Sequence, residues 1–238
     1  MALNWKTAKK DRAYQREAAE WTAQRPWILS TRPSTGMSSN LLRMIREVVG
    51  MEEAAYSALR EKYRPDKLKL LFIAESPAQS RSFYDVGTSD NDCLYLETMG
   101  VLFHNLVGGL YGEGSSHSRA ILRVKKGEYL QCFKNEGFWL LDAVPTPFAE
   151  GMNTRDKAEA IRRYAPRLME TINACRPDGC VLIGRTVYDN LADELRRAGA
   201  PVLNQEFIPF PAYGHSQAFR QKLGGLLLRH GILPLRSC

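Results

Sequence analysis

Short apolar segments alternate with helix-length segments from residue 68 onward, and this alternation limits the fold more than any other feature of the chain. The apolar segments are Leu68–Ala74, Phe138–Val144, Cys180–Ile183 and Val202–Phe210. Short, nearly continuous apolar runs are typical of strands that are buried on both faces of a parallel sheet. The chain is therefore predicted to be an α/β protein, a three-layer αβα sandwich around a central four-stranded, mostly parallel sheet.

Helical patterns fill the other segments. Apolar residues recur at roughly helical spacing between Leu41 and Tyr63, and helices are also predicted over Thr154–Cys175 and Ser216–His230. The region before the first apolar segment carries no strand pattern. We therefore expect two parts, an N-terminal helical extension over residues 1–64 and an α/β domain over residues 65–238.

The overall charge narrows the choice of partner. The formal net charge is +7 at pH 7, and the isoelectric point is about 9.2. A basic surface raises the local concentration of polyanions such as nucleic acid. A mildly basic enzyme without a polyanion partner would have the same balance, so charge alone leaves both alternatives open.

The cysteine pattern and the hydropathy indicate the compartment. The chain has five cysteines and no CxxC pair, which favours a reducing compartment over a disulfide framework. No apolar run approaches the ~18 residues that a membrane span needs. Residues 1–21 are too polar for a signal peptide. We expect a cytoplasmic protein without a membrane partner.

Polar residues follow the apolar segments. Glu75, Ser76 and Pro77 come directly after the first segment. Asp142 lies near the end of the second, and Arg185 comes shortly after the third. The fourth segment runs into the sequence FPAYGHS. Because ligands bind at the carboxyl ends of the strands in open parallel sheets, we predict the functional site at this edge.

These strand-end residues resemble the motifs of the uracil-DNA glycosylase superfamily over about residues 66–232. The sequence AESPAQS is similar to the family's GQDPYH and GEAPG motifs. Glu75 stands at the glutamate of the second type, and Ser76 stands at the catalytic aspartate of the first. Asp142, in LLDAVPTP, occupies the place of the family's base-reading asparagine. The sequence FPA aligns with the family's HPS motif, and His215 follows it in the same loop.

The resemblance implies a monofunctional DNA glycosylase that removes uracil or another deaminated or modified base in base excision repair. Cleavage of the N-glycosidic bond develops positive charge on the sugar and negative charge on the base. A carboxylate such as Glu75 can hold the attacking water and favour the positive charge. His215 can donate to the base oxygen where negative charge collects. DNA is the implied partner, a monomer is expected, and no metal or other cofactor is implied.

The base site is expected to hold an extruded base against an aromatic ring, supplied by Phe83 or Tyr84. Asp142 differs from the asparagine that the family has at this position. An asparagine amide both donates and accepts hydrogen bonds, whereas an ionised aspartate only accepts. Either Asp142 is protonated, or the preferred base is not uracil. The other residues expected at the base site are Ser76, Pro77 and Phe210.

Contacts to DNA outside the base site are expected from the last loop and from three cations. Tyr213 at the loop tip could enter the minor groove and hold the duplex open. Arg185, Arg220 and Lys222 could contact phosphates.

Two other functions fit the same residues. A binding module of the same fold would have lost catalysis because Ser76 replaces the usual aspartate. A small-molecule α/β hydrolase or a nucleotide-binding enzyme would use the same strand ends for a different substrate. The residues also have ordinary structural explanations: Glu75 could pair with a surface lysine, Phe83 and Tyr84 could pack in the core, and Asp142 could cap the following turn.

Overall fold

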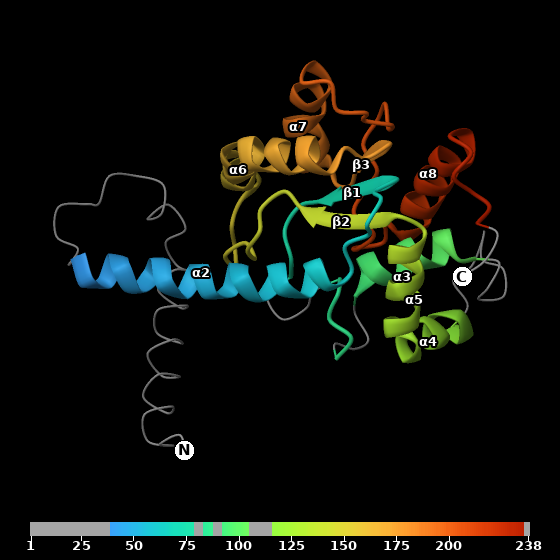
Figure 1. Cartoon of the computed structure of the whole chain (residues 1–238), viewed down its shortest axis with the longest axis horizontal. Helices are drawn as coiled ribbons and strands as arrows, with labels where there is room; N and C mark the ends of the chain where they lie inside the picture. The colour runs from blue at the N-terminus through green and yellow to red at the C-terminus, as the bar shows by residue number, and fades with distance from the viewer. Residues whose placement is uncertain (1–38, 79–82, 88–91, 105–115, 236–238) are drawn as a thin grey trace, which may run out of the picture.

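A parallel sheet of three strands lies at the centre of the described part of the molecule (Figure 1). The structure is a computed structural model, and it describes residues 39–78, 83–87, 92–104 and 116–235. The sheet has the order β2-β1-β3, so that β1 pairs with both neighbours. Its strands are β1 (Leu70–Ala74), β2 (Phe138–Asp142) and β3 (Gly179–Leu182).

The three strands form where the first three apolar segments predicted them. All five residues of β1 are buried, as the run of apolar residues requires. Leu70 is aligned with Phe138 on one side and with Gly179 on the other. A Cβ atom at Gly179 would lie 2.7 Å from Leu203 Cδ1, so glycine permits the close approach of the next segment.

The predicted fourth strand does not form among the described residues. The segment over residues 202–208 meets β3 only at two isolated parallel bridges, Cys180–Val202 and Ile183–Ile208. The predicted α/β class with a parallel sheet is confirmed. The predicted count of four strands is replaced by three strands and a bridged segment.

Proline and asparagine explain why this segment is not a regular strand. Pro201 and Pro209 flank it, and neither has a backbone N–H to donate. Between them, the side chain of Asn204 takes the place of a strand backbone. Its amide oxygen accepts from the Leu182 N–H at 3.0 Å, and its amide nitrogen donates to the Leu182 carbonyl at 3.1 Å.

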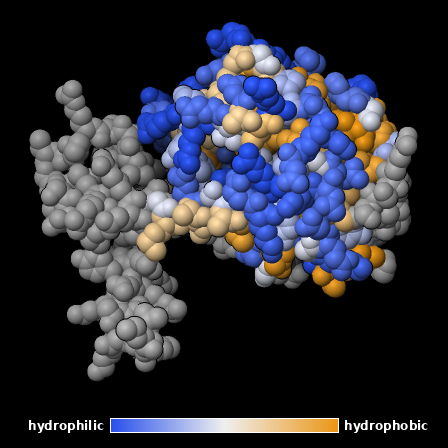
Figure 2. Space-filling view, in the orientation of Figure 1, coloured by the Kyte–Doolittle hydropathy of each residue, from blue (hydrophilic) through white to orange (hydrophobic). Residues whose placement is uncertain are grey.

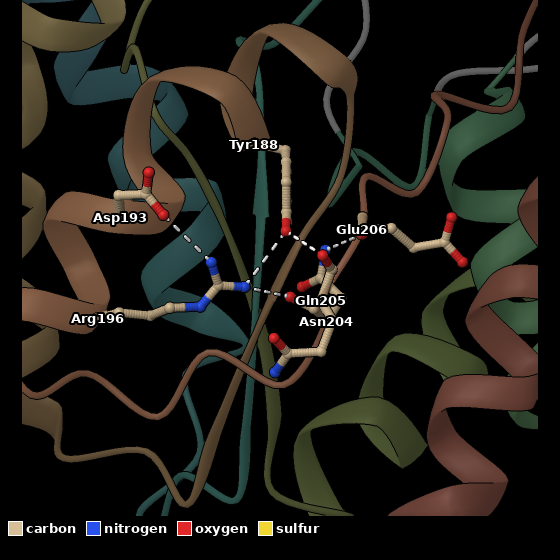
Figure 3. A network of polar contacts seen from close by, with 6 residues as sticks. All are labelled: Tyr188, Asp193, Arg196, Asn204, Gln205 and Glu206. Carbon is tan, nitrogen blue, oxygen red and sulfur yellow. Dashed lines mark hydrogen bonds and ion pairs between the residues drawn. The ribbon is translucent and has the colours of Figure 1, made fainter.

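A polar network fixes the backbone on the outer side of Asn204 (Figure 3). Arg196 donates to the Asn204 carbonyl at 2.7 Å and to the Tyr188 hydroxyl at 3.3 Å. The Tyr188 hydroxyl in turn donates to the Gln205 carbonyl. The Asn204 amide nitrogen also donates to the Glu206 carbonyl at 2.9 Å. These bonds hold the segment against β3 without a continuous ladder.

Helices cover both faces of the sheet (Figure 1). The helices α6 and α7 pack together on one face, while α3 packs against α8 and α4, and α5 packs against β2. The described helices are α2 (Ser39–Lys62), α3 (Cys93–Leu102), α4 (Ser116–Val124), α5 (Lys126–Asn135), α6 (Thr154–Cys175), α7 (Arg185–Arg197) and α8 (Ser216–Arg229).

The helix α2 runs beside β2 and contacts the domain through its last turns. The Trp139 indole N–H donates to the Arg60 carbonyl at 3.2 Å. Tyr63, just past α2, stacks on Tyr84 with ring centroids 5.7 Å apart. Residues 1–38 of the expected extension lie outside the described residues, and the division at residue 64 stays a prediction.

The described cysteines differ in oxidation state. Cys93, Cys175 and Cys180 are free, whereas Cys132 is disulfide-bonded. The expected reducing compartment predicts free thiols, so Cys132 departs from that expectation. Within the described ranges, no helix combines the length and the apolar character needed to cross a bilayer.

Replacing Asn204 with leucine should destabilise the fold. Leucine leaves the Leu182 N–H and carbonyl without their partner, which should lower the free energy of unfolding by about 2–4 kcal/mol. Urea denaturation measures the change. The matched control is Asn173→Leu on the exposed side of α6, which should change stability by less than about 0.5 kcal/mol. Equal stability of the two variants would show that the Asn204 side chain does not hold the segment.

Candidate active site at the carboxyl end of the sheet

The ends of β1 and β2 bring two predicted site residues to the same edge of the sheet. Ala74 is aligned with Asp142, so that Glu75 follows one residue beyond the pair. The ladder continues past the strands, because the Val144 N–H donates to the Glu75 carbonyl at 3.0 Å. Glu75 and Asp142 therefore lie on neighbouring strands, at the carboxyl end of the sheet.

Glu75 points toward the start of α6. Side chains alternate between the faces of a sheet, so Glu75 and Asp142 leave opposite faces at this edge. The Lys157 ammonium, on the first turns of α6, lies 3.8 Å from the Glu75 carboxylate. Both side chains are partly exposed, and the Lys157 ammonium also lies 5.3 Å from the centre of the Phe148 ring. The carboxylate thus has one cationic neighbour and retains access to water.

The turn after Glu75 is packed between α2 and the sheet. Ser76 is half-buried and Pro77 is buried. The Tyr56 hydroxyl on α2 donates to the Ala78 carbonyl at 3.2 Å. Ser76 and Pro77 therefore lie at the predicted edge, in a turn that α2 helps to fix.

Asp142 is half-buried at the end of β2, and its carboxyl forms no hydrogen bond or ion pair within the described ranges. Burial, which removes water from the charged form, raises the pKa of Asp142 to about 7. The negative charge of Asp92 raises this pKa further, and the positive charge of Arg60 opposes the rise. The carboxyl is therefore divided between its neutral and ionised forms near neutral pH.

A cavity of about 380 Å³ lies along β2, between α2 and α6. Asp142 lines one part of it, and Arg60, Arg64 and Arg167 line other parts. The Arg60 Nε atom is buried and has no hydrogen-bond partner among the described residues. Asp142 and Arg60 face a common space without forming an ion pair.

The rings of Phe83 and Tyr84 are buried in an aromatic cluster. The Tyr84 hydroxyl donates to the Leu140 carbonyl at 3.2 Å and accepts from the Leu140 N–H at 2.7 Å. Tyr84 stacks on Tyr63, and Phe83 meets Tyr95 edge to face at 5.7 Å. Both rings therefore have partners in the core, which is the structural role that the sequence left open for them.

The last loop projects from the same edge of the sheet. The Gly184 N–H donates to the Ile208 carbonyl at 2.7 Å and holds the start of the loop at the end of β3. Phe210 is 40% exposed and Tyr213 is 99% exposed. Tyr213 has a φ of 53°, the left-handed conformation of a tight turn. His215 is exposed and forms the N-cap of α8.

Two of the three predicted phosphate-binding cations flank one ring. The Arg185 guanidinium lies 3.9 Å from the centre of the Phe207 ring, and the Lys222 ammonium lies 4.7 Å from it. Lys222 also pairs with the Glu206 carboxylate at 2.6 Å. Arg185 is exposed at the N-terminus of α7, where its charge is available to a ligand.

Arg220 has an interior partner instead. It pairs with the buried Glu97 carboxylate at 2.6 Å, and Arg119 pairs with the other oxygen of that carboxylate. This cluster joins α3, α4 and α8. A phosphate contact from Arg220 would require the buried pair to open.

Several residues at the site were not predicted from the sequence. Lys157 could have been found, because the first turn of a helix that follows a strand faces the carboxyl end of the sheet. Arg60 gives no such signal, because it is one cation among many on α2. Asp92 and Lys126 form a buried pair at 2.8 Å near Asp142, and they come from segments far apart in the chain.

The fold and the site define the chain as an open, parallel α/β protein with its candidate site at the carboxyl ends of the strands. A family model described as the Uracil DNA glycosylase superfamily matches residues 61–234, which include all three strands. The chain belongs to this superfamily, and the family predicted from the sequence is confirmed. A search of curated proteins found no match to the chain.

Replacing Tyr84 with phenylalanine should lower stability, because the Leu140 N–H and carbonyl lose their partner. The expected loss is about 1–3 kcal/mol of unfolding free energy, measured by urea denaturation. The control is Tyr213→Phe, which removes a hydroxyl from a fully exposed ring and should leave stability unchanged. A Tyr84→Phe variant as stable as this control would contradict a structural role for the hydroxyl.

Proposed function

We propose that this protein is a monofunctional DNA glycosylase that hydrolyses the N-glycosidic bond of uracil or a related modified base in DNA. The observation that supports this most strongly is the position of Glu75 and Asp142 on neighbouring strands at one edge of the sheet. Membership of the superfamily supports the same reaction class. The product would be an abasic site in the DNA.

Glu75 is the proposed group that orients the attacking water. Its carboxylate accepts a proton from the water and stabilises the positive charge that develops on the sugar. Lys157 restrains the carboxylate from one side at 3.8 Å and leaves the other side open to water. Ser76 has no charge and contributes packing and a hydroxyl to the same turn.

His215 and the N-terminus of α8 are the proposed partners of the departing base. Cleavage leaves the electron pair on the base, which becomes an anion. The free N–H groups at the start of a helix favour a negative charge, and α8 begins directly after His215. A donor from His215 to the base oxygen would act in the same direction.

The exposed last loop and the neighbouring cations form the proposed DNA contact. Tyr213 at the loop tip is exposed and is proposed to enter the space that an extruded base leaves. Arg185 and Lys222 flank Phe207, in the segment that leads into this loop, and can contact phosphates. Figure 2 shows that hydrophilic residues cover most of the described surface on the face in view.

A base-release assay tests the proposal. Oligonucleotides that contain uracil, hypoxanthine, xanthine or a mismatch are incubated with the protein and then cleaved with alkali at any abasic site. We expect release of at least one base by the native protein. Glu75→Gln should reduce the rate by about 100-fold or more, because the amide cannot take a proton from water.

The matched control is Glu194→Gln, which changes an exposed glutamate near the C-terminal end of α7, away from the strand ends, and should keep the native rate. Salt-sensitive DNA binding without release of any base would contradict the glycosylase and support the binding module, in which Ser76 has replaced the catalytic aspartate. Stronger binding of free nucleotides than of DNA would support the small-molecule enzyme.

Replacing Tyr213 with alanine should weaken action on duplex DNA more than on single strands. The ring is proposed to fill the gap in the duplex, and a single strand has no such gap. The measurement is the ratio of kcat/KM for the two substrates. Val124→Ala, another exposed apolar change, should leave the ratio unchanged. Equal losses on both substrates would show that Tyr213 does not hold the duplex open.

A further inference from the structure

Two exposed arginines on neighbouring helices are held by neutral groups. On α6, the Arg162 guanidinium donates to the amide oxygen of Asn190 on α7. The Asn190 amide nitrogen donates to the Thr186 carbonyl at 2.8 Å, which fixes the orientation of the amide. The Arg185 guanidinium lies 3.9 Å from the centre of the Phe207 ring. Each arginine is thus held at the surface by a partner that carries no charge.

The neutral partners leave the charge of both arginines uncompensated. Within the described ranges, neither Arg162 nor Arg185 forms an ion pair with a carboxylate. Glu159 and Asp189 lie about one helical turn from them along α6 and α7, and neither pairs with them. Other cations in this part of the molecule are paired with carboxylates: Arg163 with Glu159, Arg167 with Glu53, Arg196 with Asp193, and Lys222 with Glu206.

The two arginines border one surface of the molecule. The helices α6 and α7 pack side by side (Figure 1). Arg185 is the first residue of α7, which follows β3 at the carboxyl end of the sheet. Asn190 is bonded to the first turn of α7 and brings Arg162 toward the same end of that helix. The two guanidinium groups therefore flank the first turns of α7, one on the side of α6 and the other on the side of Phe207.

Guanidinium groups in fixed positions are suited to bind phosphate oxygens. A guanidinium is planar, is always charged, and can donate to two phosphate oxygens at once. A side chain that is already held in place loses little conformational freedom on binding. A nucleic-acid strand presents negative charges at regular intervals along its backbone. Two separate, uncompensated guanidinium groups therefore fit successive phosphates of one strand.

We propose that the surface bordered by Arg162 and Arg185, the α6–α7 surface, binds the phosphate backbone of a DNA strand. Asn190 and Phe207 act as positioning residues, because they hold the two guanidinium groups without reducing their charge. This inference rests on the proposed function in taking DNA as the partner. It adds a contact that lies outside the base site and does not depend on the base that is removed.

DNA is favoured over an acidic protein as the partner of this surface. The formal net charge of +7 and the membership of the superfamily both favour a nucleic acid. Arg185 also lies at the edge of the sheet at which Glu75 ends its strand, so a strand that reaches Glu75 passes close to Arg185. The carboxylates of an acidic protein offer similar charge, and they form one arm of the test.

The test measures how binding to undamaged DNA depends on salt. The probe is a fluorescent single-stranded oligonucleotide without any modified base, so that no catalytic step enters the measurement. Each phosphate contact to a single strand contributes about 0.7 to the slope of log affinity against log salt concentration. We expect Arg162→Gln and Arg185→Gln each to lower this slope by about 0.7, and the double variant to lower it by about 1.4.

Two further variants separate position from charge. Arg163→Gln is the matched control, because Arg163 is the next residue on α6 and is also exposed, but its charge is already paired with Glu159. It should keep the native slope. Asn190→Ala keeps the charge of Arg162 and releases its guanidinium. It should weaken binding several-fold at low salt and leave the slope unchanged, because the contact forms from a less ordered side chain.

The outcomes separate this inference from the proposed function. Native slopes in both Arg162→Gln and Arg185→Gln overturn the inference, even if the protein releases a base. Equal losses of slope in Arg162→Gln and Arg163→Gln also overturn it, because the fixed position would then have no effect. Tighter binding of polyglutamate than of DNA, lost in Arg162→Gln, overturns it in favour of an acidic protein. The expected slopes without release of any base would support the inference and contradict only the glycosylase.

Discussion

The structure depends on the pairing of β1 with a parallel strand on each side. Its five residues are buried, so their N–H and carbonyl groups must find partners inside the sheet. The ladders to β2 and β3 supply these partners and fix the register of both neighbours. Because the strands are parallel, the same register places the residues after all three strands at one edge. The position of Glu75 and Asp142 on neighbouring strands at this edge, on opposite faces of the sheet, is thus a consequence of backbone hydrogen bonding.

The acidic side chains around this sheet differ in how well their charges are neutralised. The carboxylates of Asp92 and Glu97 are neutralised by bonded cations: Asp92 has Lys126, and Glu97 has two arginines. Such pairs offset the cost of burial by hydrogen bonds and opposite charge. At the edge, Asp142 has no such partner, and Glu75 has one lysine at 3.8 Å. The groups proposed to meet the substrate are those that the fold has left incompletely satisfied, which is typical of functional sites.

The sequence predicted the elements that depend on local pattern. Continuous apolar runs predicted β1, β2 and β3, and the predicted helix over Thr154–Cys175 has the bounds of α6. Order along the chain also predicted that Glu75 and Asp142 would share an edge. These features depend on periodicity and on the geometry of parallel sheets, which one sequence contains.

Features that depend on tertiary contacts could not be predicted in this way. The apolar segment after Pro201 looked like a fourth strand, but the Asn204 side chain bonds to β3 where a backbone would. The burial of Arg220 beside Glu97 could not be distinguished from an exposed helical cation. The nearness of Arg60 to Asp142 depends on how α2 lies against β2, and no sequence spacing encodes that angle. The pKa of Asp142 depends on that arrangement and on burial.

The hydroxyl of Tyr84 has a consequence for association between molecules. The strand β2 ends the sheet on one side of the described structure, and an unpaired strand offers its N–H and carbonyl groups to any extended chain. Tyr84 occupies both groups of Leu140, and Asn204 occupies those of Leu182 on the opposite side. Side chains thus act as terminators of a very short sheet and oppose its growth by addition of strands from another copy. Tyr84 follows Glu75 in the sequence. Displacement of the Tyr84 side chain would therefore uncover the N–H and carbonyl groups of Leu140 and favour aggregation through β2.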